Sequence, residues 1–85
     1  MGDGVREAIL RQLALRGHGR ERVLIGYCLD RGYTRGEALD ELRALQDLGE
    51  VRMVRAGAST GDNLYALTSA GHDIARGHGY HEAPE

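Results

Sequence analysis

Apolar residues recur every three or four positions between Thr34 and Gly49, which is the spacing of one face of an α-helix. Thr34 suits the cap of the first turn, and Glu37 stands three places later, as in a capping box. Gly49 is a stop signal, because glycine readily takes the left-handed conformation that ends many helices. The pattern predicts a helix over residues 34–48 with an apolar face made of Ala38, Leu39, Leu42, Leu45 and Leu48.

A β-hairpin is expected directly after this helix. Val51–Arg55 and Leu64–Leu67 have the length and composition of two short strands, and a turn bounded by glycines separates them at residues 57–61. Side chains alternate between the two faces of a strand, so Tyr65 and Leu67 share a face. We expect that face to join the hydrophobic core.

The segment before residue 34 predicts two more helices. The first covers residues 3–16, with Asp3 as its cap and an apolar stripe along one side. Gly17-His18-Gly19 ends it and leaves room for a strand of at most two or three residues. The second helix covers residues 20–31 and is apolar around most of its circumference, so it lies centrally in the core or against a partner chain.

The segment after the hairpin predicts a short final helix. Thr68 and Ser69 cap it, it runs over residues 70–76, and Ile74 is its main anchor in the core. The remaining residues, 77–85, are rich in glycine and polar side chains, and we expect a flexible tail there. The predicted organisation is therefore one domain over residues 1–76 followed by the tail.

Composition narrows the function classes. A chain of 85 residues builds one small core and has little room for a deep substrate pocket. The net charge of −2 speaks mildly against nucleic acid, but lysine is absent and all 11 basic residues are arginine, which suits bidentate contacts to phosphate. Cys28, the only cysteine, is expected to be a small buried core residue. With no membrane-length apolar run and no signal peptide, a cytoplasmic location is expected.

The order helix, helix, helix, hairpin and helix resembles the winged helix-turn-helix superfamily. It is most similar to small bacterial regulators of the MarR, PadR and ArsR type, and residues 67–77 also look like short winged-helix proteins of Mu-like phages. The resemblance implies a mostly helical α+β fold with three helices, a two-stranded wing and a short C-terminal helix. It also implies a small transcriptional regulator that binds duplex DNA, as a possible homodimer. The residues that carry it are Leu42, Leu45, Leu48, Gly49 and Val51, then Tyr65, Leu67, Thr68 and Gly71.

In such a fold the helix over residues 34–48 is the recognition helix. The stripe opposite its leucines is acidic, because Asp40 and Asp47 accompany Arg43, and Glu37 lies alongside. Phosphates flanking the DNA groove repel carboxylates. A solvated helix face is therefore the competing interpretation of this stripe.

Other arginines are better placed for phosphate contacts, at the start of the second helix and on the first strand of the wing. An ordinary charged surface is again the alternative. The wing tip at residues 58–60 carries no basic side chain, which argues against its insertion into the minor groove. The candidate DNA-binding residues are Arg20, Arg22, Arg35, Arg43, Arg52 and Arg55.

Two functions remain open from the sequence. One is the DNA-binding regulator, and the other is a winged-helix protein–protein interaction module without DNA binding. We expect no enzyme activity and no cofactor, because no nucleophile–base pair and no phosphate-binding glycine motif is present. The set formed by His72, His78, His81 and Glu82 lies mostly in the glycine-rich tail, and we predict no metal site there.

Overall fold

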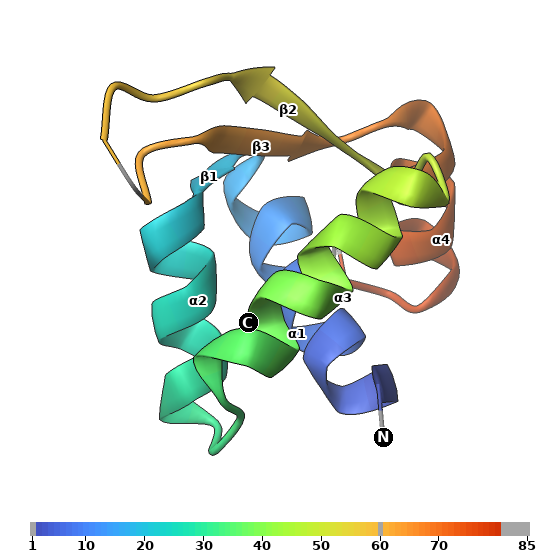
Figure 1. The fold of residues 1–85 in the computed structure, drawn as a ribbon. Coiled ribbons are helices and arrows are strands. Elements are labelled where there is room, and N and C mark those ends of the chain that lie inside the picture. Colours follow the sequence, from blue (N-terminus) through green and yellow to red (C-terminus); the bar gives the residue numbers. More distant parts are fainter. Residues whose placement is uncertain (1, 60, 81–85) are drawn as a thin grey trace.

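The computed structural model describes residues 2–59 and 61–80, and within them the predicted order of elements is confirmed (Figure 1). The fold is α+β, mostly helical, with four helices and a three-stranded antiparallel sheet in the described residues. The elements are α1 (Gly2–Arg16), β1 (Gly19–Arg20), α2 (Glu21–Asp30), α3 (Arg35–Asp47), β2 (Val51–Arg55), β3 (Leu64–Leu67) and α4 (Ser69–Gly77).

Both ends of α3 form as the sequence predicts. The Glu37 backbone N–H donates to the Thr34 hydroxyl at 3.1 Å, and the Thr34 N–H donates to the Glu37 carboxylate at 2.8 Å. The hydrogen bonds that the Glu37 carboxylate receives from the backbone and then the side chain of Thr34 lower the pKa of Glu37, because they favour its charged form. At the other end Gly49 has a φ of 78°, the left-handed conformation expected of it. The capping box and the glycine stop are therefore confirmed.

The sheet has the strand order β1-β3-β2, so β2 is one of its edges. The short strand expected near Gly19 is present, and it pairs Gly19 with Tyr65. Strand β2 pairs with β3 from Val51 to Arg55, with a register shift between Met53 and Arg55. Tyr65 and Leu67 are buried at 3% and 4% exposure, which confirms the predicted core face of β3.

One core lies between the helices and the sheet. Figure 1 shows α2 and α4 on opposite sides of the molecule, with α3 in the foreground and the sheet above the helices. Helix α1 contacts α2, α3 and α4, so it is the central element of the core. Cys28 is fully buried in this core, as predicted, and burial raises the pKa of its thiol. A protonated, buried thiol is a packing residue and a poor nucleophile.

Three expectations about apolar side chains need correction. Leu48 is 56% exposed, because the chain reverses at Gly49 and Val51 of β2 fills this end of the core instead. Burial of helix α2 all round within the core is wrong, since its Val23 and Leu29 are 47% and 48% exposed, and its contact with a partner chain stays a prediction. In α4 the fully buried residue is Ala75, and Ile74 is only partly buried.

The segment expected to be a flexible tail is partly packed on the domain. The Tyr80 side chain is only 9% exposed and belongs to the core, and its backbone N–H donates to the carbonyl of Ala75 at 2.9 Å. The ring of Tyr80 stacks on His78. The large apolar area of tyrosine accounts for this packing. Residues 81–85, the rest of the predicted tail, lie outside the described residues.

Candidate nucleic-acid interface

The wing is attached to the first turn of α2 by backbone hydrogen bonds. The first N–H groups of a helix have no partner within the helix. Here the Glu21 N–H donates to the carbonyl of Asn63 at 2.8 Å, and the Arg22 N–H donates to the carbonyl of Gly61 at 3.0 Å. The returning arm of the wing therefore satisfies two donors of α2, and the two elements hold a fixed relation to each other.

A buried polar network reinforces this attachment. The Glu21 side chain accepts hydrogen bonds from the Tyr65 hydroxyl at 3.0 Å and from Asn63 Nδ2 at 3.4 Å. The other amide atom, Asn63 Oδ1, accepts from the Gly57 N–H at 2.9 Å, so Asn63 joins both arms of the wing to α2. Burial, and then the hydrogen bond to Glu21, raise the pKa of Tyr65. We call Glu21, Asn63 and Tyr65 the wing latch.

The two arms of the wing approach closely beside the latch. A Cβ atom on Gly57 would lie 2.5 Å from the backbone carbonyl carbon of Asp62, a distance that only glycine permits. The Asp62 carboxylate also forms an ion pair with the Arg22 guanidinium at 2.6 Å. This pair is largely exposed and contributes about 0–1 kcal/mol at most. The latch therefore does more than the ion pair to fix the wing.

Asn63→Ala tests the latch. The substitution leaves the Gly57 N–H without its partner and removes one donor to Glu21, so we expect it to lower the free energy of unfolding by about 1–3 kcal/mol. Urea denaturation measures the loss, and NMR shows whether the amide signals of Gly57 and Glu21 move. Asp62→Asn is the matched control in the same turn, and we expect a loss below about 1 kcal/mol. Equal losses of stability in the two variants would mean that the wing latch contributes no more to the fold than the exposed carboxylate of Asp62.

Two of the predicted arginines come together at the base of the wing. Arg20 is the N-cap of α2 and Arg55 is the last residue of β2, and both line a surface hollow of about 240 Å³. Gly57 and Asp62 also line it. Both arginine side chains are exposed, and in the described part of the chain neither makes an ion pair. The wing latch and the backbone hydrogen bonds at the start of α2 hold in place the elements that carry Arg20 and Arg55.

The other predicted arginines are distributed differently. Arg22 starts α2 as well, but its guanidinium is engaged by Asp62. Arg35 and Arg43 lie on the exposed side of α3. Arg52 follows the buried Val51 on β2, so it points to the opposite face of the sheet and does not line the hollow. The structure therefore assembles Arg20 and Arg55, and leaves the others around them or away from them.

The acidic residues of α3 divide into two kinds. Glu41 is paired with Arg6 of α1 at 2.7 Å and its side chain is 12% exposed, and Glu37 belongs to the capping box. These two carboxylates have partners within the fold. Asp40 and Asp47 are exposed beside Arg43, as predicted. The outer face of α3 is thus mixed in charge, and the repulsion that it offers to phosphate comes mainly from these two residues.

Sequence reasoning missed Glu21 and Asn63. Glu21 stands between two arginines at a helix start, where acidic residues are ordinarily solvated. Asn63 follows Asp62 in a turn, where both residue types are common. No signal in the neighbouring sequence distinguishes Glu21 and Asn63 from ordinary surface residues. Their roles depend on pairing across 42 positions of the sequence.

Metal-binding clusters and membrane-spanning helices are absent from the part of the chain that the structure describes. No three His, Cys, Asp or Glu side chains there are placed to hold a metal ion. His81 and Glu82, members of the histidine set considered above, are outside that part. No described helix has the length and apolar character needed to cross a membrane.

Comparison with known proteins identifies the fold. No protein-family profile and no curated protein matches the chain. Two solved structures of a double mutant of ZitR from Lactococcus lactis are similar to this chain. The first has a TM-score of 0.70 and a sequence identity of 22%, and the second, in apo form, has a TM-score of 0.73 and a sequence identity of 21%. They cover 92% and 94% of this chain, which spans only 51% and 58% of theirs. The likeness extends over nearly all of the chain, which therefore has the winged-helix fold.

Proposed function

We propose that this chain binds duplex DNA and acts as a small transcriptional regulator of the MarR, PadR or ArsR type in a bacterium or phage. The observation that carries the proposal is the convergence of Arg20 and Arg55 on one hollow at the base of the wing. Arg35 and Arg43, exposed on α3, are further candidates for phosphate contacts. A non-enzymatic role, a cytoplasmic location and a homodimer belong to the same proposal.

Phosphate contacts account for most of the affinity in this arrangement. Guanidinium groups bind phosphate oxygens bidentately, and such contacts position a protein on the duplex without reading its sequence. Arg20 sits at the start of a helix whose dipole also favours an anion there. The small negative net charge of the chain is compatible with this binding, because the field near the wing base depends on the local arginines.

A salt titration with duplex DNA tests the proposal. Fluorescence anisotropy with a labelled duplex of mixed sequence should show affinity that falls as salt rises from about 50 to 200 mM, with a slope of about −0.9 per phosphate contacted. Phosphate attraction is strongest at the lowest salt. Absence of binding under that condition would exclude DNA as the partner of this surface.

Asp40→Asn and Asp47→Asn test the acidic residues of α3. If α3 faces DNA, each substitution removes a repulsive charge near phosphate. We expect affinity to rise about two- to fivefold at low salt, since a unit charge at short range in water contributes about 1 kcal/mol. The same anisotropy titration measures the change. Asp73→Asn on α4 is the control, and it should leave affinity unchanged; a rise of the same size in the control would mean that only net charge matters.

Binding to a protein is the second candidate function. Leu48, Met53 and Val54 are 56%, 41% and 44% exposed where α3 passes into the edge strand β2. Exposed apolar side chains near a free strand edge are typical of surfaces that meet another chain. Light scattering together with the DNA titration separates the two functions. A protein-interaction module predicts self-association or partner binding and no salt-dependent affinity for DNA.

A further inference from the structure

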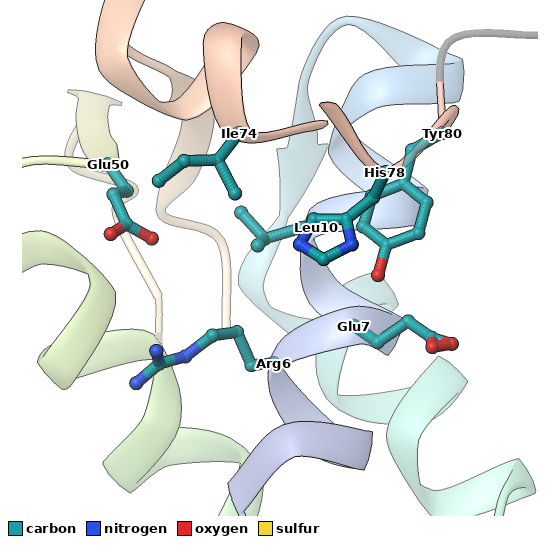
Figure 2. Close-up of a pocket in the computed structure, with 7 residues that line it drawn as sticks. All are labelled: Arg6, Glu7, Leu10, Glu50, Ile74, His78 and Tyr80. Carbon is teal, nitrogen blue, oxygen red and sulfur yellow. The ribbon is translucent and has the colours of Figure 1, made fainter. Parts of the chain in front are cut away.

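A second hollow, away from the wing base, lies between α1 and the end of α4 (Figure 2). Its volume is about 430 Å³, within the range of sites for small molecules. Leu10 and Ile74 form its apolar part, and the stacked rings of His78 and Tyr80 form a wall. Such a surface suits the apolar body of a small ligand.

The polar groups of this hollow carry an excess of negative charge. Arg6, Glu7 and Glu50 line it. Arg6 already binds Glu41 at 2.7 Å, so its charge is offset within the fold. Arg11 lies over the ring of Tyr80 at 5.2 Å but does not line the hollow. The carboxylates of Glu7 and Glu50 therefore favour a cation over an anion.

Glu50 supplies the specific contact. Its Oε1 atom is buried and accepts no hydrogen bond from any described residue. The backbone of Glu50 is fixed, because its N–H donates to the carbonyl of Leu45 at 2.9 Å and its carbonyl accepts from Thr68 at 3.0 Å. A buried acceptor without a donor is costly, and it is satisfied when a ligand brings an N–H group.

We propose that this hollow binds a small primary amine in its protonated form, with the ammonium group donating to Glu50 and the apolar body resting on Leu10, Ile74 and Tyr80. The hollow and the wing base lie in different parts of the fold and share no lining residue. The hollow is formed by α1, by α4 and the residues after it, and by Glu50 between α3 and β2, whereas the wing base is formed by β1, the end of β2 and the turn after it. Amine binding therefore does not depend on DNA binding, and the two are tested separately.

Three ligands of nearly equal shape test the proposal on the full chain without DNA. Benzylamine is a cation at pH 7, benzyl alcohol is neutral and benzoate is an anion. In two-dimensional ¹H–¹⁵N NMR we expect saturable shifts with benzylamine at Leu10, Glu50, Ile74 and Tyr80, and a rise in Tm with its concentration. The alcohol and benzoate should bind at least about tenfold more weakly, as the loss of a charge-assisted hydrogen bond implies.

Two variants identify the group that recognises the amine. Glu50→Gln should weaken benzylamine binding by about tenfold or more, whereas Glu7→Gln, in the same hollow but exposed, should change it much less. Equal binding of amine and alcohol, no shifts at the four residues, or unchanged affinity in Glu50→Gln would each overturn the proposal. If Glu50→Gln does not fold, the comparison of the three ligands on the unaltered chain decides.

Discussion

Replacing Arg20 and Arg55 together with glutamine is expected to lower the affinity for duplex DNA by about ten- to hundredfold at low salt. Each arginine would lose a hydrogen bond between charged groups, a contribution of about 1.5–3 kcal/mol before any compensation. Two fewer phosphate contacts should also reduce the slope of log affinity against log salt by about 1.8. Anisotropy titrations at several salt concentrations measure both changes.

Glutamine keeps much of the length and polarity of arginine, so the loss reports charge rather than packing. Both side chains are exposed, and we expect the free energy of unfolding to change by less than about 0.5 kcal/mol. Arg76→Gln on α4 is the matched control, since Arg76 is exposed and paired with Asp73. An equal loss of affinity in the control would mean that net charge alone explains the effect. Full affinity in the double variant would disprove the role of the wing base in DNA binding.

Arg22→Gln adds a comparison within the same turn of α2. Arg22 is as close in sequence to the helix start as Arg20, but it forms an ion pair with Asp62 at 2.6 Å. Binding phosphate would require Arg22 to give up this partner. We therefore expect a smaller effect from Arg22→Gln than from Arg20→Gln in the same titration, a difference that the sequence alone does not predict.

The elements that local signals define were predictable from the sequence. The capping box at Thr34, the stop at Gly49 and the two short strands depend on residues within a few positions of each other. The spacing of the leucines gave the buried side of α3 as far as Leu45. Periodicity carries no information on where the core ends, however. It predicts that Leu48 is buried, whereas this C-cap residue of α3 is 56% exposed.

The candidate site was less predictable because it depends on contacts between distant segments. Arg20 and Arg55 were both named from the sequence, but their convergence requires the attachment of the wing to α2. That attachment rests on Asn63, which pairs with Glu21 across 42 positions. Tyr80 is a similar case, since a glycine-rich segment with polar residues does not indicate that the Tyr80 ring joins the core. The features that were predictable depend on local propensity, whereas those that were not depend on pairing between distant segments.

Leu45→Ala is expected to have the largest effect on stability. Leu45 is fully buried on α3, and truncating a buried leucine to alanine lowers the free energy of unfolding by about 2–5 kcal/mol. A domain of this size has a total stability of roughly 4–13 kcal/mol, so the loss is a large share of it. Tm should fall by about 10 °C or more. Urea denaturation and thermal melting followed by circular dichroism measure both quantities.

Leu48→Ala is the matched control, because it removes the same atoms one turn further along the chain. The two leucines are equivalent in the periodic pattern of the sequence, but the structure buries only the first. Truncating Leu48 removes little buried apolar area, so we expect the free energy of unfolding to fall by less than about 1 kcal/mol. A loss at Leu48 as large as at Leu45 would mean that another surface covers this end of α3. Concentration-dependent melting would then identify a second copy of the chain as that surface, because stabilisation by association grows with the logarithm of the protein concentration.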